Sequence, residues 1–397
     1  MRRVAVVGGS LAGLTAARTI RRQGHQGPVV VIGAEPHLPY QRPPLSKEIL
    51  SGKWQPERAQ LKIEDGLDLE FRTGVRAASL SVDDRTIGLD DGTSLDFDGL
   101  VIATGADVRR LPGLPDLQGV HYLRTIDDCL AIRRAMESGP RVAVIGAGFI
   151  GSEVAATCRG QDLDVTVVEA MPVPLERALG PTMGEVVARL HRQHGTDIRL
   201  GAAVEGLDGS GRVRGVRLGD GEVVAADLVV VGVGVKPATE WLEGSGLRLD
   251  DGVVCDATCR ALREDGGVAD DIVAAGDVAR WAHPLFGEEM RFEHWDNAVA
   301  QGQAAAGNLL RAAPEELEPF DHVPYFWSDQ YGSKLQFVGT AQPDDEVTVV
   351  EGSVDDWKFV AAYRRQDRVV GALLVNRMSR MPAYQKLIAE GGPVPAA

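Results

Sequence analysis

The chain has 397 residues, of which 44% are hydrophobic and 25% charged, and its formal net charge at pH 7 is −15. This length suggests about two to four domains, and the composition is that of a globular protein with a sizeable core. The negative charge argues against nucleic acid or an anionic membrane surface as a partner, since both repel an acidic protein.

No run of residues approaches the roughly 18 apolar residues that span a membrane. The chain also shows no signal-peptide pattern, because Arg2-Arg3 passes directly into the strand-like Val4–Val7. We therefore expect no membrane segment and a cytoplasmic protein. The four cysteines are too scattered for a disulfide framework, and none forms the C-x-x-C spacing of a thioredoxin-type dithiol.

Two stretches of the chain share one pattern of apolar strand, glycine-rich turn, helix and second apolar strand. The first copy consists of Arg3–Val7, Gly8–Gly13, Leu14–Gln23 and Val29–Ile32. The second copy consists of Arg141–Ile145, Gly146–Gly151, Ser152–Arg159 and Val165–Glu169. Each copy therefore predicts a βαβ unit.

The similarity continues downstream, where each copy has two short strands and a final apolar strand that ends near a glycine. In the first copy these are Arg85–Leu89, Ser94–Phe97 and Leu100–Ile102. In the second copy these are Val213–Leu218, Glu222–Ala225 and Leu228–Val231. We interpret the chain as an internal duplication of a dinucleotide-binding domain.

The pattern changes after Asp277. A helix is predicted at about Asn297–Leu310, followed by an acidic, proline-containing link over Ala313–Pro324. The strands predicted after the link are Leu335–Gly339, Glu346–Val350, Lys358–Arg364 and Arg368–Val375. The predicted fold class is therefore α/β, with two Rossmann-like dinucleotide-binding domains and a C-terminal α+β domain. The two successive dinucleotide-binding domains resemble the glutathione-reductase-like arrangement.

The second glycine motif has the G-x-G-x-x-G form between a strand and a helix, which suits a pyrophosphate on the helix N-terminus. The residues assigned to this site are Gly146, Gly148, Ile150, Gly151 and Gly232. Glu169 ends the next strand, where a carboxylate binds a ribose 2′-OH and repels a 2′-phosphate. This predicts NADH rather than NADPH, and the alternative is that Glu169 is only a surface residue at a strand end.

The first glycine motif departs from this form, since Ser10 stands where the second glycine is usual. Serine is small enough to keep the close approach of the backbone to a ligand. Two dinucleotide sites in one chain imply a bound FAD in addition to a pyridine nucleotide.

Several further strings accompany the glycine motifs. They are Tyr40-Gln41-Arg42-Pro43-Pro44-Leu45-Ser46-Lys47, Ala103-Thr104-Gly105, Tyr122-Leu123-Arg124-Thr125, Ala274-Ala275-Gly276-Asp277 and Phe326-Trp327-Ser328-Asp329-Gln330. Together with the glycine motifs and with Glu153, which follows the second motif, these strings resemble the FAD-dependent ferredoxin reductases of cytochrome P450 and aromatic-ring dioxygenase systems. The resemblance covers nearly the whole chain. The Arg-Pro-Pro-Leu-Ser-Lys and Trp-Ser-Asp-Gln strings are more specific than the glycine motifs.

The resemblance implies how FAD is bound. It assigns cofactor-binding roles to Gly8, Ser10, Ala12, Gly13, Arg42, Lys47, Ala77, Thr104, Gly105, Arg124, Asp277 and Trp295. Trp295 is expected just before a helix that starts at Asp296 or Asn297 and directs its positive end toward the flavin. Many members have an acid at the position of Ala34, so we expect the neighbouring Glu35 to bind the adenosine ribose instead. Trp327 is expected either to contact the flavin or only to fill a domain interface.

By the same resemblance, Lys47 and Glu153 meet beside flavin N5 at the nicotinamide site. We predict that this catalytic pair orients the reactants and shapes the local field, because the flavin itself carries the hydride chemistry. The alternative is a structural ion pair at a domain junction.

The expected domains are an FAD-binding domain over 1–108 and 240–318, an NADH-binding domain over 109–239 and a C-terminal interface domain over 319–397. We expect a monomer or a weak dimer.

Two other groups of residues are assigned no chemistry. His191 and His194 have no further ligand nearby at metal spacing, so we predict no metal site and a solvated helix face. Cys255 and Cys259 are predicted to be isolated thiols.

The segment from Lys358 to Lys386 has seven basic residues and one acid. It is either a docking patch for an acidic ferredoxin or a solvated basic face.

The sequence therefore predicts an NADH:ferredoxin reductase that passes electrons to a [2Fe–2S] ferredoxin, which supplies a P450 or an oxygenase. The second hypothesis is a disulfide, peroxide or oxygen reductase of the same fold, but its reactive cysteine is missing from Tyr40–Ile49. A DNA-binding flavoprotein similar to apoptosis-inducing factor is disfavoured by the net charge, and a flavin monooxygenase lacks a supporting motif.

Overall fold

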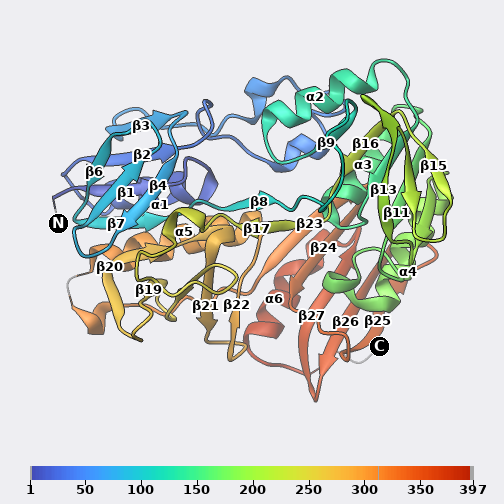
Figure 1. Cartoon of the computed structure of the whole chain (residues 1–397). Helices are drawn as coiled ribbons and strands as arrows, with labels where there is room; N and C mark the ends of the chain where they lie inside the picture. The colour runs from blue at the N-terminus through green and yellow to red at the C-terminus, as the bar shows by residue number, and fades with distance from the viewer. Residues whose placement is uncertain (1, 312, 394–397) are drawn as a thin grey trace. The chain divides into compact units, whose positions relative to one another are not determined.

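A parallel βαβ unit forms the centre of the first dinucleotide-binding fold (Figure 1). Strand β1 (Val4–Val7) pairs in parallel with β2 (Val29–Gly33) on one side and with β7 (Gly99–Ile102) on the other. Helix α1 (Leu11–Arg22) connects β1 to β2. All residues of the three strands are buried, which explains why none of the strands contains a polar side chain.

The sheet around this unit has nine strands in the order β22-β21-β18-β19-β20-β7-β1-β2-β3. Its other strands are β3 (Leu69–Thr73), β18 (Val253–Cys255), β19 (Arg260–Leu262), β20 (Val268–Ala274), β21 (Ala279–His283) and β22 (Glu288–Met290). A separate antiparallel sheet consists of β4 (Ala77–Ser81), β5 (Thr86–Leu89) and β6 (Ser94–Asp96).

The second dinucleotide-binding fold repeats this plan. Strand β10 (Val142–Ile145) lies between β11 (Val165–Glu169) and β16 (Leu228–Val231), and all three are parallel. The other strands of this five-stranded sheet are β9 (Val120–Tyr122) and β12 (Asp197–Leu200), and its helices are α2 (Ile126–Met136), α3 (Phe149–Arg159) and α4 (Glu176–Gln193). Its antiparallel sheet consists of β13 (Val204–Ser210), β14 (Arg212–Leu218) and β15 (Val223–Ala225). The predicted duplication is therefore present in the topology.

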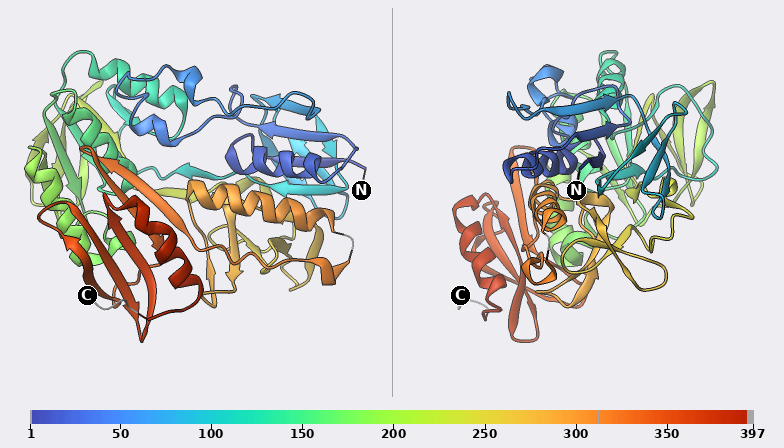
Figure 2. Two further views of the ribbon diagram at one scale, coloured as in Figure 1. Left: turned by 180° about the vertical axis from the view of Figure 1, so that it is seen from behind. Right: turned by 90° about the vertical axis from the view of Figure 1, so that its left-hand side faces the viewer.

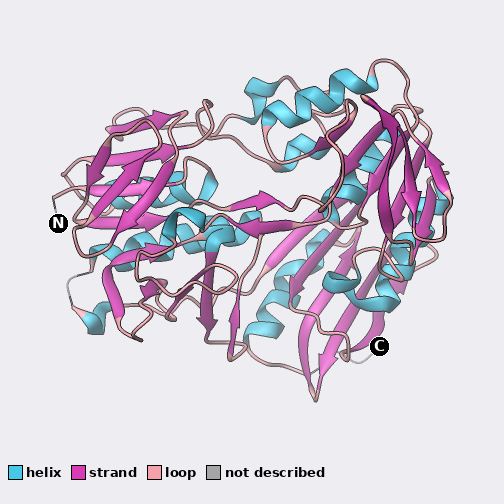
Figure 3. Cartoon of the chain, viewed as in Figure 1, coloured by secondary structure: helices cyan, strands magenta, loops and turns pink. Residues whose placement is uncertain are grey.

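The C-terminal part is an antiparallel sheet that packs against one helix (Figure 3). Its strand order is β23-β24-β27-β26-β25, and helix α6 (Met381–Ala389) contacts β24 and β27. The strands are β23 (Tyr325–Gln330), β24 (Ser333–Gly339), β25 (Glu346–Ser353), β26 (Lys358–Arg365) and β27 (Arg368–Val375). The α+β prediction for this part is confirmed.

The computed structural model describes residues 2–311 and 313–393. The chain forms two compact units. Unit 1 consists of residues 1–41, 59–107 and 236–324, and unit 2 consists of 42–58, 108–235 and 325–397. This division differs from the expected boundaries in two respects. The second dinucleotide-binding fold and the C-terminal sheet, expected as two domains, belong to one compact unit. Residues 42–58, which we had assigned with the first domain, pack with the second dinucleotide-binding fold and the C-terminal sheet.

In unit 1, helix α5 (Trp295–Leu310) lies along α1, as the left view of Figure 2 shows. A Cβ added to Gly302 would lie 2.7 Å from the carbonyl oxygen of Ala12. Glycine is therefore needed where α5 approaches the first turn of α1. Helix α5 begins two residues before the predicted Asn297, so Trp295 is its first residue and not a residue that precedes it.

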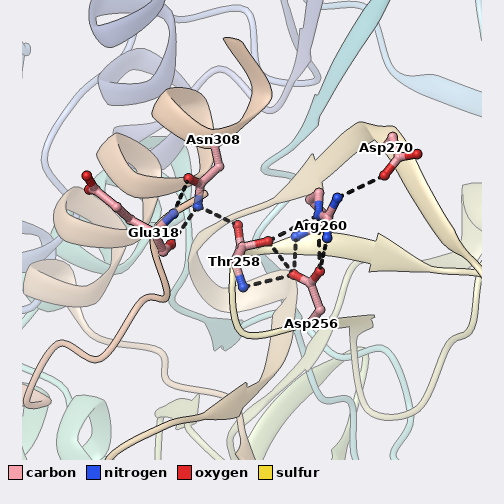
Figure 4. A network of polar contacts seen from close by, with 6 residues as sticks. All are labelled: Asp256, Thr258, Arg260, Asp270, Asn308 and Glu318. Atoms are coloured by element: carbon pink, nitrogen blue, oxygen red, sulfur yellow. Dashed lines mark hydrogen bonds and ion pairs between the residues drawn. The ribbon is translucent and has the colours of Figure 1, made fainter. Parts of the chain in front are cut away.

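The C-terminal end of α5 is tied down by a polar network (Figure 4). The Asn308 amide nitrogen donates to the carbonyl oxygens of Thr258 at 2.8 Å and Glu318 at 2.9 Å. Its side-chain oxygen accepts from the Glu318 N–H at 3.0 Å. Arg260 extends the network through ion pairs to Asp256 and Asp270, each at 2.9 Å. The Asn308 side chain therefore joins the end of α5 to Thr258 and to Glu318 in the segment that follows the helix.

Helices α1 and α3 each begin three residues earlier than predicted, at Leu11 and Phe149. The last residues of each glycine motif already form the first helical turn, which apolar periodicity alone does not reveal. None of the helices in 2–311 and 313–393 is long and apolar enough to cross a membrane.

Candidate functional site

In both glycine turns, the last glycine lies very close to the carbonyl group of the first glycine. A Cβ added to Gly13 would lie 1.9 Å from the carbonyl oxygen of Gly8, and one added to Gly151 would lie 2.0 Å from that of Gly146. Neither turn has room for a side chain at its last glycine. In each fold, the helix therefore starts directly against the turn that follows the first strand, as a dinucleotide site requires.

Both helix N-termini are left open to an anion. Helices α1 and α3 begin after Ser10 and Gly148, neither start has a side-chain cap, and neither first turn contains an acid. A Cβ on Gly148 would meet no protein atom within 4 Å. Free N–H groups and the helix dipole favour a negative group at such a place. The residues present thus fit the pyrophosphates of FAD at α1 and of NADH at α3.

Glu169 lies against the second glycine turn. One of its carboxylate oxygens accepts from the Ala147 N–H at 2.6 Å, and the other accepts from the Met171 N–H at 2.8 Å. Its carboxylate thus lies where β11 ends beside the turn, as the assignment to a ribose hydroxyl requires. Ile150 is 44% exposed in the first turn of α3, and a Cβ on Gly232 would lie 3.5 Å from the Gly151 nitrogen.

The residues of unit 1 that are assigned to FAD lie where strands or helices of this unit begin or end. The Tyr40 hydroxyl donates to the Glu35 carboxylate, which follows β2. Thr104 donates through Oγ1 to the carbonyl of Ala238 at 2.8 Å, and Gly105 accepts from the Ala238 N–H at 3.0 Å. The remaining assigned residues are Ala77 at the start of β4, Asp277 in the 3-10 helix Gly276–Val278 and Trp295 at the start of α5.

Arg42 and Arg124, which are far apart in sequence, lie together in unit 2. The Arg42 guanidinium donates to the carbonyl oxygen of Arg124 at 2.7 Å. Arg124 precedes the capping box formed by Thr125 and Asp128 at the start of α2. Trp327 lies on β23, with its ring stacked on Tyr325 at a centroid distance of 6.0 Å.

Lys47 and Glu153 form a nearly buried ion pair, with 2.6 Å between Lys47 Nζ and Glu153 Oε2. Their side chains are 13% and 4% exposed. The Ser46 hydroxyl donates to the same carboxylate oxygen at 2.6 Å. From β23, the Ser328 hydroxyl donates to Glu153 Oε1 at 2.8 Å, and the Asp329 N–H donates to it at 3.3 Å. Both carboxylate oxygens are therefore held, which compensates the cost of burying the charge.

Ser46 and Ser328 were not singled out from the sequence, although both stand inside the strings that carried the resemblance. Their contact with Glu153 joins residues more than 100 positions apart. Strand β23 was not predicted either, because the Tyr325–Gln330 run is too short and too polar to show a clear period.

The prediction of a solvated face for His191 is wrong. His191 is 1% exposed, and its Nε2 lies 3.1 Å from Gln330 Oε1. Its Nδ1 lies 2.9 Å from the Tyr331 hydroxyl. Burial lowers the pKa of His191 to about 4, so its ring is neutral at pH 7. The C-terminal sheet covers this face of α4, which periodicity within α4 could not show.

All four cysteines are free and buried. Cys129 lies close to the Pro43–Ser46 turn, where its thiol donates to the Leu45 carbonyl at 3.0 Å. Burial raises the pKa of Cys129 to about 12 and that of Cys259 also to about 12. These thiols therefore remain protonated at neutral pH, which disfavours a thiolate nucleophile.

Three of the seven basic residues between Lys358 and Lys386 pair with acids of β25 or of the turn before it. Arg364 pairs with Glu346, Arg365 pairs with Asp345 at 2.8 Å, and Arg380 hydrogen-bonds to Glu351 at 2.9 Å. The local excess of positive charge is therefore smaller than this segment of sequence suggests.

Residues 2–302 match the pyridine nucleotide-disulphide oxidoreductase family, and residues 325–397 match the reductase C-terminal family. Rhodocoxin reductase of Rhodococcus erythropolis is 38% identical over 98% of this chain and 90% of its own. The ferredoxin–NAD(+) reductase component of the anthranilate 1,2-dioxygenase system of Burkholderia cepacia is 36% identical over 97% of this chain and 94% of its own.

Among solved structures, the covalent putidaredoxin reductase–putidaredoxin complex superposes with a TM-score of 0.92 at 33% identity, over 99% of this chain and 94% of the matched chain. The resemblance to ferredoxin reductases and the predicted fold class are thus confirmed, and so is the expectation of an oxidoreductase that uses FAD and NADH. The chain belongs to the pyridine nucleotide-disulphide oxidoreductase family and carries that family's reductase C-terminal domain.

Proposed function

We propose that the protein is an NADH:ferredoxin reductase that delivers electrons to a [2Fe–2S] ferredoxin, which in turn supplies a P450 or an aromatic-ring oxygenase. The observation that carries this proposal is the Lys47–Glu153 pair, nearly buried and held by Ser46 and Ser328, in a unit that also contains an open dinucleotide site. The relatives named above are reductases that bear rhodocoxin or ferredoxin in their names, and the solved complex contains putidaredoxin.

Different residues of the chain would bind the cofactors and orient the reactants of such an enzyme. FAD, when bound, would supply the chemistry that links NADH, a two-electron donor, to a one-electron acceptor. The amides at the starts of α1 and α3 bind the two pyrophosphates, Glu169 binds the NADH ribose, and Glu35 binds the FAD adenosine ribose. Arg42, Arg124, Asp277, Trp295 and Trp327 complete the FAD contacts. Lys47, oriented by Glu153, places its ammonium beside the reacting rings.

We further propose the three functional domains expected from the sequence, a cytoplasmic location, and a monomeric or weakly dimeric state. An acidic ferredoxin would dock on the basic segment through Lys358, Arg368 and Arg377, which form no ion pair within the described residues. Raising the ionic strength should then weaken ferredoxin-dependent turnover, and indifference to salt would remove this docking assignment.

A disulfide, peroxide or oxygen reductase is the second candidate. It needs a reactive thiolate beside the flavin, and the buried Cys129 beside Leu45 is a protonated thiol. This contact favours the ferredoxin reductase.

The test is NADH-dependent reduction of cytochrome c by the purified FAD-loaded protein, with and without an added [2Fe–2S] ferredoxin, repeated with NADPH. Strong stimulation by the ferredoxin, with NADH preferred, supports the proposal. Steady NADH consumption that the ferredoxin does not stimulate, with oxygen, peroxide or a disulfide as the acceptor, would establish the second candidate instead.

A further inference from the structure

A continuous line of side-chain hydrogen bonds runs through unit 2 from Glu153 to Thr196. Ser328 Oγ lies 2.8 Å from Glu153 Oε1, and Gln330 Nε2 lies 3.1 Å from Ser328 Oγ. His191 Nε2 lies 3.1 Å from Gln330 Oε1. The line ends with Tyr331 and Thr196, since the Tyr331 hydroxyl is 2.9 Å from His191 Nδ1 and 2.6 Å from Thr196 Oγ1.

The direction of every bond in this line follows from the first one. An ionised carboxylate only accepts, so the Ser328 hydroxyl donates to Glu153. Its single hydrogen is then used, and Ser328 must accept from the Gln330 amide nitrogen. This turns Gln330 Oε1, which only accepts, toward the histidine ring.

The second half of the line is determined in the same way. Because Gln330 Oε1 accepts, His191 Nε2 carries the hydrogen. A neutral imidazole has one N–H, so His191 Nδ1 accepts and the Tyr331 hydroxyl donates to it. Thr196 must then donate to the Tyr331 oxygen. In each of the five hydrogen bonds, the donor therefore lies on the Thr196 side and the acceptor on the Glu153 side. This single assignment of the hydrogens gives every bond one donor and one acceptor.

Most members of this hydrogen-bonded line are buried, which strengthens the bonds between them. Ser328 and Gln330 are both 0% exposed, His191 is 1% exposed and Thr196 is 3% exposed. Bulk water therefore does not compete for most of these hydrogen bonds, and aligned hydrogen bonds strengthen one another in such surroundings. Burial also raises the pKa of Tyr331 to about 12, so its hydroxyl keeps the hydrogen that it donates.

We propose that Ser328, Gln330, His191, Tyr331 and Thr196 form a one-way hydrogen-bond chain that holds the Glu153 carboxylate in place and thereby orients Lys47. His191 and Tyr331 are thus positioning residues that act through Glu153 and touch neither NADH nor FAD. This inference rests on the proposed function only in placing the Lys47–Glu153 pair at the nicotinamide site. It gives the C-terminal strand β23 a part in the reaction with NADH.

The first experiment measures the tautomer of His191 directly. Side-chain ¹⁵N NMR of the FAD-loaded, ¹⁵N-histidine-labelled protein would be recorded at neutral pH, with the His191 signal assigned from its loss in His191→Gln. We expect a neutral ring with the hydrogen on Nε2. A ring protonated on Nδ1, or a charged ring, would overturn the one-way chain whatever the enzyme reduces.

The second experiment measures anaerobic reduction of the bound flavin by NADH in single-turnover mixing. Ser328→Ala removes a hydrogen bond to a charged group and should slow reduction roughly tenfold or more. Tyr331→Phe removes a more distant neutral donor and should slow it roughly twofold to tenfold. Ser328→Thr keeps the hydroxyl and should restore most of the rate.

The matched control is Tyr384→Phe, which removes a tyrosine hydroxyl that bonds to Glu351 at 3.1 Å in the same unit. It should reduce at the wild-type rate. If Tyr331→Phe and Ser328→Ala also match the wild type, the positioning role is refuted, while the NADH reaction itself stands. If the wild-type flavin is not reduced by NADH at all, the proposed function fails, and the tautomer measurement still decides whether the chain exists.

Discussion

Glu169 at the end of β11 accepts a hydrogen bond from the backbone N–H of Ala147 in the glycine turn, at 2.6 Å. This contact places a carboxylate against the turn that would hold the NADH pyrophosphate. A negative charge at that point is expected to accept bonds from ribose hydroxyls and to repel a 2′-phosphate, so we propose that Glu169 selects NADH over NADPH.

Replacement of Glu169 should therefore change the cofactor preference. In Glu169→Ala, loss of the bond between a charged group and the ribose should lower kcat/KM for NADH roughly tenfold or more. NADPH should lose less, because its repulsion is relieved at the same time. Steady-state kinetics with both cofactors measure the ratio, and the exposed Glu205→Ala serves as the control. An unchanged ratio would mean that Glu169 is only a surface residue at a strand end.

Lys47→Met should both destabilise the protein and slow flavin reduction by NADH. It leaves the buried Glu153 charge without its partner, which costs about 3–5 kcal/mol in comparable buried pairs. The double variant Lys47→Met/Glu153→Gln removes the charge. Its amide oxygen still accepts from Ser328, while its NH2 group donates to Ser46, whose hydroxyl can donate to the Pro43 carbonyl instead. Its thermal stability should therefore recover while its reduction rate remains low.

These two variants separate the functional role of Lys47 from a purely structural ion pair. If the double variant regains the wild-type rate of flavin reduction, the pair is structural. Lys53→Met, which removes an exposed lysine close in sequence, should match the wild type in stability and rate.

Gly302→Ala should weaken FAD retention and lower the melting temperature. The added methyl group would lie 2.7 Å from the Ala12 carbonyl and would push α5 away from the first turn of α1. Gly307→Ala on the same helix is the control, since its methyl group would meet only the end of the flexible Gln23 side chain, at 3.3 Å. Alanine normally stabilises a helix by up to about 1 kcal/mol over glycine. A Gly302→Ala protein that binds FAD like Gly307→Ala would contradict this account of the helix contact.

Stability should fall as the pH is lowered from about 6.5 to about 4. Burial lowers the pKa of His191 from 6.5 to about 4, so in this range the unfolded chain takes up a proton that the folded protein does not. The stabilisation is complete above pH 6.5 and is lost by pH 4, with a magnitude on the order of 3 kcal/mol. Burial also lowers the pKa of His294 to about 4 and lowers the pKa of His283, so both act in the same direction.

Urea unfolding at several pH values would measure this dependence. His191→Gln should show a shallower decline than the wild type, because one of the histidines whose pKa is lowered by burial is gone. An equal decline in both proteins would show that His191 does not contribute.

The glycine turns and the strands beside them were predictable because their requirements are local. Gly13 and Gly151 stand where a side chain would enter the backbone of their own turn, and runs such as Val142–Ile145 are apolar throughout because both faces of their sheets are covered. The helix starts were less predictable, since Leu11 and Phe149 belong to the motif and to the helix at once.

The pairing of Lys47 with Glu153 was expected only from the resemblance, and the serines that hold Glu153 were not expected at all. Likewise, Glu346 and Asp345, which pair with Arg364 and Arg365, lie outside the basic segment, so the net charge of that surface could not be derived from residues 358–386 alone.

The order of residues along the chain thus established the duplicated dinucleotide-binding folds, the choice of NADH and the family. These features depend on short-range backbone geometry and on strings of adjacent residues. Packing of β23 against α3 and α4 decided the rest, because it brings Ser328 to Glu153 and Gln330 to His191. Such contacts join positions more than 100 residues apart, and whether a buried polar group is satisfied depends on partners that only the folded chain supplies.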